Sequence, residues 1–358
     1  MRRSYGYNSY RGRVTFQGFL RGLIIVLAVI LILALVGYFL LQRYVVYTDQ
    51  GQKFRFPFLA GEKDPSPSES VQIVVGGQES VSPEPTASPV EEEPLQAVWL
   101  PLTALAQETV EEQVFAAGGN AVILDMKLED GSLGYHSQLE LADQSGANAA
   151  DEDGTRNEAI QTLNRGTLYT VARVCCFKDD RLSDVDRAMN ILTNSGYLWR
   201  DPDGVRWINP ANEQVRAYLI GIARELAQLG FDEILLDFAG YPTQGELGWI
   251  KDGSDYPRDE LDGPISTFYE ELSLALEDYE GKVSIRTTVE ALTGADGYSG
   301  QTPENLAAWS DRIWVEQPEE KEDCLTPLRD AGVRDPEERL VWVLEGTGDG
   351  EESWAVFS

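Results

Sequence analysis

From residue 95 to the end of the chain, short apolar runs alternate with segments of helical periodicity. The runs are AVWLPL (97–102), AVILDMK (121–127), TLYTVARVCCF (167–177), EILLDF (233–238), KVSIRTTV (282–289), RIWVEQ (312–317), RLVWVLEG (339–346) and SWAVF (353–357). They are continuously apolar rather than alternating with polar residues, which is typical of parallel strands buried on both faces. The pattern therefore predicts eight buried strands.

Helices are expected between most of these strands. The clearest follows the third run, where Asn209 should cap a helix that has Pro210 at its first position and ends at Gly230. Its apolar stripe at helical spacing consists of Val215, Leu219, Ile222, Leu226 and Leu229. Further helices are expected within 184–195, 265–279 and 306–311. Repeated strand–helix alternation predicts a (β/α)8 TIM-type barrel over 95–358. Since only TGDGEES separates the last two runs, the barrel either closes without a helix there or is incomplete at its C-terminal end.

The N-terminal part of the chain has a different composition. Residues 22–42 contain no charge and match the ~20 residues that a transmembrane helix needs, whereas the apolar core of a cleaved signal peptide is shorter, ~7–15 residues. Five arginines and no acid precede residue 42, so the positive-inside rule predicts a cytoplasmic tail over 1–21 and an extracellular remainder. Residues 43–94, rich in Pro, Ser and Glu, are expected to form a linker. The predicted location is the cell membrane, with a single pass.

Charge and composition exclude several classes of function. Beyond residue 42 the chain carries 24 basic and 60 acidic groups, which would repel a phosphate backbone and argues against nucleic-acid binding. The single histidine and the lack of a CxxC pair argue against a metal site, and no glycine motif suggests a cofactor. Cys175 and Cys176 are neighbours on a predicted strand, so their side chains should point to opposite faces and remain free thiols.

Reactive side chains of such a barrel lie at the C-terminal ends of its strands. Asp237 is the strongest candidate, because three apolar residues precede it and an aromatic turn follows. The same rule selects Asp125, Lys127, Lys178, Asp179, Glu290, Glu316 and Glu345, with Arg173 and Arg286 directed at the barrel mouth. Carboxylates with aromatic residues such as Trp207 and Tyr241 are typical of a sugar site, where a carboxylate pair supplies acid and base or nucleophile. For Glu316 and Glu345 individually, a surface or salt-bridge role is favoured over a catalytic one.

Three segments carry a resemblance to a known family: GGNAVILDMKLEDGSLGYHS, YTVARVCCFKDD and WINPANEQVRAYLIGIARELAQLGFDEILLDFAGYP. Together they resemble a family of "putative glycoside hydrolases", formerly a domain of unknown function, found in bacterial membrane-anchored and secreted proteins and similar in outline to alpha-amylase-type barrels. The resemblance implies a TIM barrel that hydrolyses a glycosidic bond. It places the fourth-strand aspartate of the family at Asp237. Further family positions correspond to Asp125, Lys127, Arg173, Lys178 and Asp179.

Two hypotheses follow for the function. The first is a membrane-tethered extracellular hydrolase of a cell-envelope or environmental polysaccharide, with Asp237 and Glu290 as its carboxylate pair. The second is a catalytically inactive barrel that binds cell-wall or capsular glycan, favoured by Ala239-Gly240 and Thr287-Thr288, where the family has other residues. If Asp237 is catalytic, we expect its charge to be unpaired among other acids, so that Asp237→Asn leaves stability unchanged or raises it.

Overall fold

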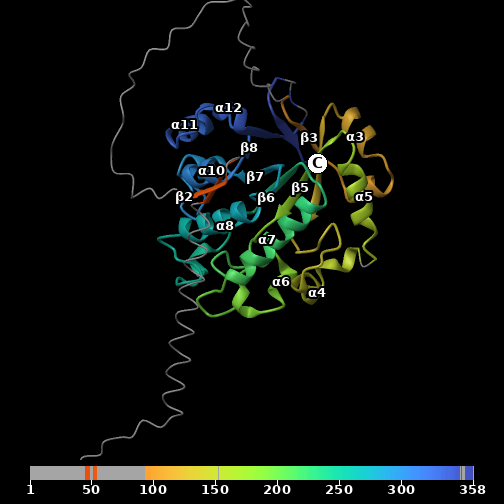
Figure 1. The fold of residues 1–358 in the computed structure, drawn as a ribbon. Coiled ribbons are helices and arrows are strands. Elements are labelled where there is room, and N and C mark those ends of the chain that lie inside the picture. Colours follow the sequence, from red (N-terminus) through yellow and green to blue (C-terminus); the bar gives the residue numbers. More distant parts are fainter. Residues whose placement is uncertain are drawn as a thin grey trace, which may run out of the picture. The chain divides into compact units, whose positions relative to one another are not determined.

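The computed structural model describes residues 45–48, 51–54, 93–151, 153–346, 348 and 351–357. The chain divides into two units, Met1–Thr86 and Ala87–Ser358 (Figure 1). In the first unit, strands β1 (Val45–Thr48) and β2 (Gly51–Phe54) pair antiparallel, so the expected linker contains a hairpin. Its β-branched and aromatic residues, VVYT, favour a strand. The membrane helix expected at 22–42 lies outside the described residues. No helix of the described ranges is long and apolar enough to cross a membrane.

The second unit is a closed barrel of parallel strands, and all eight expected strands are present. They are β3 (Gln96–Trp99), β4 (Ala121–Lys127), β5 (Tyr169–Cys175), β6 (Glu233–Asp237), β7 (Lys282–Thr287), β8 (Arg312–Glu316), β9 (Leu340–Leu344) and β10 (Trp354–Val356). Strand β10 pairs with both β9 and β3 and thereby closes the barrel. Closure is reinforced by backbone bonds from Trp354 N to Leu95 O and from Trp342 N to Ser353 O. The short final connection therefore leaves the barrel complete.

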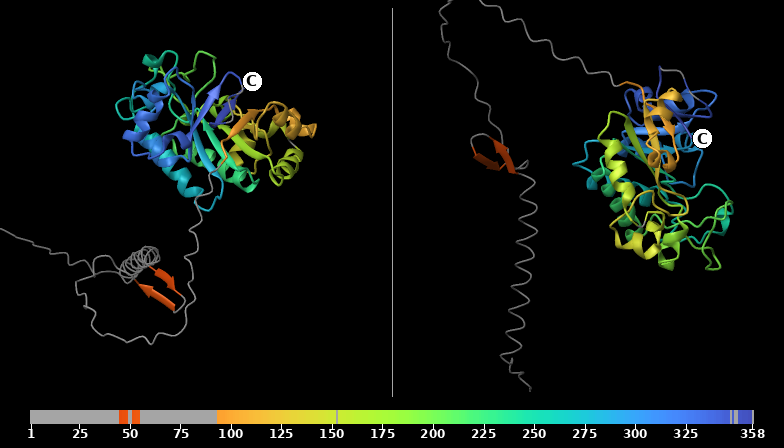
Figure 2. Two further views of the ribbon diagram at one scale, coloured as in Figure 1. Left: turned by 90° about the horizontal axis from the view of Figure 1, so that it is seen from above. Right: turned by 90° about the vertical axis from the view of Figure 1, so that its right-hand side faces the viewer.

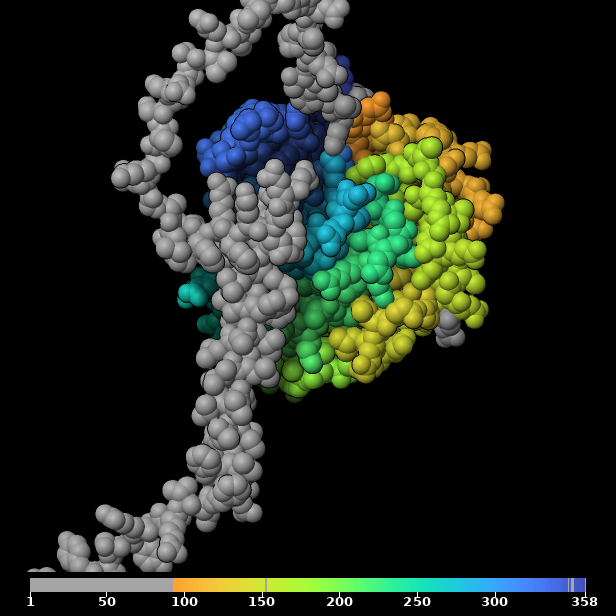
Figure 3. Space-filling view, in the orientation of Figure 1, coloured from red at the N-terminus to blue at the C-terminus, as the bar shows by residue number. Residues whose placement is uncertain are grey.

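Helices surround the strands on the outside (Figure 2). They are α2 (Leu102–Ala106), α3 (Val110–Ala116), α4 (Glu140–Ser145), α5 (Thr155–Asn164), α6 (Asp180–Ser183), α7 (Glu213–Gln228), α8 (Asp262–Ala275), α9 (Val289–Leu292), α10 (Pro303–Trp309), α11 (Glu322–Asp330) and α12 (Pro336–Arg339), with 3-10 turns at Ala147–Ala150, Arg187–Met189 and Leu247–Trp249. On the face seen in Figure 3, the yellow, green and blue segments follow one another around the surface, as expected when helices cover a barrel.

Two local expectations were wrong. Helix α7 is capped by Asn212, whose side chain accepts bonds from the amides of Gln214 and Val215; Asn209 instead accepts a bond from the Ala211 amide in the preceding turn. The expected helix over 184–195 is only the short turn Arg187–Met189. There the Asn190 side-chain amide donates to the carbonyls of Ser183 and Asp186, and such local bonds compete with a helix.

The barrel interior consists of three layers, because alternate residues of each strand point inward. On β6 these are Glu233, Leu235 and Asp237. The middle layer is apolar and includes Ile123, Val171, Leu235, Trp314 and Val341. The lower layer, at the N-terminal ends, is a buried ion-pair cluster in which Glu233 accepts bonds from Tyr169, Ser284, Arg312 and Trp314. The apolar layer thus separates a polar base from the polar upper layer that contains Asp237.

Candidate active site

A cavity of about 600 Å³ opens beside the C-terminal ends of β6 and β7. Its wall combines the end of β6 with the loops that follow β4, β5, β6 and β7. The lining includes Glu129, Lys178, Asp201, Asp203, Trp207, Asp237, Phe238, Tyr241, Arg286, Glu290, Asp296 and Glu316. The C-terminal face is where TIM-barrel enzymes place their active sites, so this cavity is the candidate site.

Asp237, the last residue of β6, is fixed by two arginines. Its Oδ2 lies 2.7 Å from Nε of Arg173 and 3.1 Å from Nη1 of Arg286, and its Oδ1 accepts a bond from the Phe238 amide. Burial, the largest single influence, raises the pKa of Asp237, but the charges of Arg173 and Arg286 and the bonds to Asp237 outweigh it and hold the pKa below its ordinary value. The expectation of an unpaired charge among acids is therefore wrong. Asp237 is a buried carboxylate that is ion-paired with two arginines and ionised at neutral pH.

The backbone at this point is strained. Phe238 has a φ of 47°, a left-handed conformation that non-glycine residues seldom adopt. This conformation turns the chain sharply after Asp237 and lets the Phe238 amide bond back to the carboxylate. Strain of this kind is typical of functional sites.

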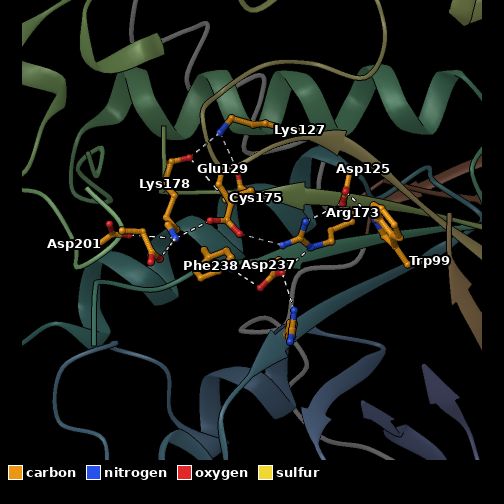
Figure 4. Close-up of polar contacts among 12 residues, drawn as sticks. Trp99, Asp125, Lys127, Glu129, Arg173, Cys175, Lys178, Asp201, Asp237 and Phe238 are labelled. Carbon is orange, nitrogen blue, oxygen red and sulfur yellow. Dashed lines mark hydrogen bonds and ion pairs between the residues drawn. The ribbon is translucent and has the colours of Figure 1, made fainter. Parts of the chain in front are cut away.

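Asp237 is the centre of a chain of alternating charges that follows the strand ends around the barrel (Figure 4). On one side, Arg173 of β5 also bonds Asp125 of β4 at 2.8 Å, and Asp125 in turn accepts a bond from the Trp99 indole at the end of β3. On the other side, Arg286 of β7 approaches Glu316 of β8 at 3.5 Å. Six consecutive strands thus contribute one side chain each. Asp125 and Arg173 do not line the cavity but hold Asp237 in place from behind.

Lys178 forms a second charged centre in the cavity wall. Its Nζ lies 2.7 Å from Glu129, 3.1 Å from Asp201 and 3.5 Å from Asp203, and 4.6 Å from the centre of the Phe238 ring. Burial alone lowers the pKa of Lys178, but the bonds to Glu129 and Asp201 outweigh it and raise the pKa. Lys178 therefore stays protonated and holds the carboxylates of Glu129, Asp201 and Asp203 together at the cavity wall.

Glu290, the second predicted carboxylate, lines the cavity in a different environment. It belongs to the first turn of α9, a helix capped by the Thr288 hydroxyl, and it lines the same cavity as Asp237. Its side chain is exposed, and among the described residues no hydrogen bond or ion pair engages its carboxylate. The site thus combines one buried, ion-paired carboxylate with one that is solvated and free to meet a ligand.

The aromatic wall of the cavity is formed by Trp207 and Phe238, whose rings meet edge to face with centroids 6.1 Å apart. Trp207 also donates its indole N–H to Asp201. Tyr241 reaches the lining but is almost fully buried, and its ring packs against Tyr256. Aromatic rings held this rigidly can stack on a flat apolar ligand face.

Besides Asp125 and Arg173, three further predicted binding residues do not line the cavity. Lys127 is fully buried, 2.9 Å from Asp179, and bonds the Cys175 carbonyl; Asp179 also caps α6 through the Leu182 amide. Both are thus structural residues out of reach of a ligand in the cavity. Glu345 is exposed beyond the end of β9 and is not part of the lining.

Four residues of the cavity wall were not predicted from the sequence: Glu129, Asp201, Asp203 and Phe238. Glu129 follows β4 closely, and Phe238 follows Asp237, so a wider search around strand ends could have found both. The two aspartates lie in the segment between the 3-10 turn Arg187–Met189 and α7, where no strand end marks them. Among the described residues, no group of three or more His, Cys, Asp or Glu side chains is placed to hold a metal ion.

Residues 98–314 match the family described as "Putative glycosyl hydrolase domain", more than half of the chain, and the chain therefore belongs to this family of glycoside hydrolases. A hypothetical protein from Ruminiclostridium thermocellum ATCC 27405 is 26% identical, with a TM-score of 0.44, 52% of this chain and 96% of that one being covered. The glycoside hydrolase domain of PgaB (BpsB) from Bordetella bronchiseptica is 12% identical, with a TM-score of 0.48. The match covers 74% of this chain and 94% of that one. An alpha-galactosidase from Lactobacillus brevis is 11% identical, with a TM-score of 0.46. The match covers 74% of this chain and 37% of that one. The comparison with curated proteins gave no match.

Proposed function

We propose that this protein is a membrane-tethered, extracellular glycoside hydrolase that cleaves a polysaccharide with Asp237 and Glu290. One observation carries the proposal. A carboxylate kept ionised by two arginines and an unengaged second carboxylate line one cavity at the C-terminal face of a barrel. Hydrolysis of a glycosidic bond needs two carboxyl groups in unlike states, one charged and one able to give a proton.

Asp237 suits the charged role. Its lowered pKa keeps it ionised at every physiological pH, so it can act as a nucleophile or as the base that activates water, or stabilise an oxocarbenium-like transition state. The two arginines that hold it also fix its direction.

Glu290 suits the acid role. Its carboxylate is exposed and engages no side chain among the described residues, so it can approach the glycosidic oxygen of a sugar in the cavity and give it a proton. The charge of Asp237, in contrast, is held by its two arginines. Glu316, which is largely exposed and paired with Arg286, is less suited to give a proton.

The cavity wall supports binding of a sugar. The ring of Phe238 is partly exposed beside the buried Trp207, and the carboxylates of Glu129 and Asp203 offer hydrogen-bond acceptors for hydroxyl groups. The strongly acidic chain outside the N-terminal arginines favours a neutral or cationic glycan over an anionic one.

The proposed location follows from the sequence of the N-terminal part. The uncharged run at 22–42 is long enough to span a bilayer, and the arginines before it favour a cytoplasmic N-terminus. The barrel would then act outside the cell, on envelope or environmental polysaccharide.

The test is release of reducing ends from a panel of polysaccharides by the full-length chain. We expect Asp237→Asn and Glu290→Gln each to lower kcat by at least about a hundredfold. Glu345→Gln, an exposed acid outside the cavity, is the matched control and should act like the parent. If the parent binds a polysaccharide of the panel but hydrolyses none, the second hypothesis, an inactive glycan-binding barrel, replaces this one.

A further inference from the structure

A second aromatic surface lies on the loops that follow β5 and β6. Tyr197 and Trp249 are 74% and 63% exposed, the two most exposed large apolar side chains among the described residues. Together with Thr193, Asn194 and Ser195 they line a hollow of about 490 Å³. We call these five residues the platform. It contains two rings and three uncharged hydrogen-bonding side chains, and no charged group.

Hydrogen bonds between the two loops fix the residues of the platform in place. The Asn194 amide donates to the Trp249 carbonyl at 2.8 Å, the Asn194 side chain donates to the Gly248 carbonyl, and the Lys251 amide donates to the Leu192 carbonyl. Tyr197 closes a tight turn with Thr193 through reciprocal bonds. The two loops are thus joined by backbone bonds, and the exposed rings are held on an ordered frame.

The exposed rings are not what holds these loops together. That role belongs to Trp199, which is buried and donates its indole N–H to the Glu246 carbonyl of the other loop. Its ring also lies close to Gly245. Because the buried Trp199 already packs the two loops together, the exposed rings of Tyr197 and Trp249 do not contribute to the stability of the fold. Exposed apolar surface of this kind indicates an interaction site.

The platform and the candidate active site are built by the same two loops. Asp201, Pro202 and Asp203 of the first loop and Thr243 and Gln244 of the second lie in the wall of the catalytic cavity. Tyr197 is five residues from Pro202 in the cavity wall. Because five fully extended residues span about 17 Å, the distance between these two residues cannot be longer than that. Several consecutive sugar units of one chain can cover that distance.

We infer that the platform is a second glycan-binding site that holds a polymer chain extending from the catalytic cavity. Exposed aromatic rings beside uncharged hydroxyl and amide groups suit the apolar face and the hydroxyl groups of neutral sugars. The inference rests on the proposed function and deepens it: the substrate is a long, neutral or weakly cationic polysaccharide, engaged at both sites, rather than a short oligosaccharide.

The test separates binding from hydrolysis. The full-length chain with Glu290→Gln is run through native gels that contain hydroxyethyl cellulose, glycol chitin, chitosan or soluble starch. We expect at least one polymer to retard it, and Tyr197→Ala with Trp249→Ala to weaken that affinity about tenfold. Phe115→Ala, which removes an equally exposed ring from α3, is the control and should not change retardation. Equal retardation with and without the platform rings, or retardation by none of the polymers, overturns the inference.

A second measurement uses the active chain. With Glu290 intact, removal of both platform rings should raise KM for the retained polymer and leave kcat/KM for a short oligosaccharide of the same sugar unchanged. If no hydrolysis occurs but the platform still binds polymer, the proposed function fails and the second binding site remains. If hydrolysis occurs and the rings have no effect on polymer binding, only this inference fails.

Discussion

Arg173 joins the ends of three neighbouring strands by placing its guanidinium between Asp125, at 2.8 Å, and Asp237, at 2.7 Å. Arg286 contacts Asp237 from the opposite side. The candidate catalytic carboxylate is therefore neutralised by its neighbours before any ligand arrives, and its charge is a stabilising part of the upper layer of the barrel.

The first prediction concerns the stability of Asp237→Asn. Because two arginines would lose their shared counter-charge in a buried place, we expect the free energy of unfolding to fall by about 3 kcal/mol. Urea unfolding followed by circular dichroism measures it, with exposed Glu345→Gln expected within about 0.5 kcal/mol of the parent. Unchanged or increased stability, the outcome that the sequence suggested, would contradict the ion-pair arrangement.

The second prediction is a pH dependence. The pKa of Asp237 is lower in the folded chain than the ordinary value of an aspartate, about 3.9, so its ion pairs add stability above that pH and lose it as the pH falls through the folded pKa. The difference in unfolding free energy between the parent and Asp237→Asn should be constant from pH 5 to 8 and shrink below about pH 4. A difference that instead changes near neutral pH would show that Asp237 is not held ionised.

The third prediction uses the opposite end of the barrel as a comparison. Glu233 is completely buried and bonds four side chains, among them Arg312 at 2.5 Å. Glu233→Gln should cost about 3–5 kcal/mol of stability, because it removes the buried negative charge that pairs with Arg312. The apolar layer separates Glu233 from the cavity, so kcat per folded molecule should be unaffected. If kcat falls although the Glu233→Gln variant is fully folded under the assay conditions, Glu233 takes part in catalysis.

The fourth prediction concerns the three cysteines, which are free and buried as expected for Cys175 and Cys176. Burial raises the pKa of Cys175 to about 12 and that of Cys324 to about 11, so few thiolates form at pH 8. A thiol reagent should label none of the three rapidly in the folded protein and all three in denaturant. Mass mapping without reduction checks the same point, and a Cys175–Cys176 or Cys176–Cys324 bridge would refute it.

The fifth prediction concerns the proposed membrane topology. If residues 22–42 span the membrane with the N-terminus inside, a protease added to intact cells should cut within 60–94 and release a fragment that contains the barrel. Immunoblotting of the supernatant detects it. A barrel that stays protected until the cells are lysed would reverse the orientation.

Much of the fold could be predicted because its signals are local. Each buried strand is a short apolar run, and each main helix has its own periodicity, so the eight strands and the barrel class could be recognised without knowing any contact. The position of Asp237 at a strand end was also local information. The cap of α7 was misplaced from Asn212 to Asn209, since both residues offer a side-chain oxygen near the helix start, and only the backbone course selects between them.

The partners of the site residues were decided by the tertiary structure alone. Asp125 and Lys127 are two positions apart and would share one face of a regular strand, but the register shifts between them, so that Asp125 faces Arg173 and Lys127 is buried against Asp179. Asp237 meets arginines 64 and 49 positions away in sequence. Charge pairing of this kind depends on strand order and stagger, which arise only when the barrel closes. The sequence by itself thus determined the scaffold and the place of Asp237, whereas closure of the barrel decided that Asp237 is a paired, ionised group.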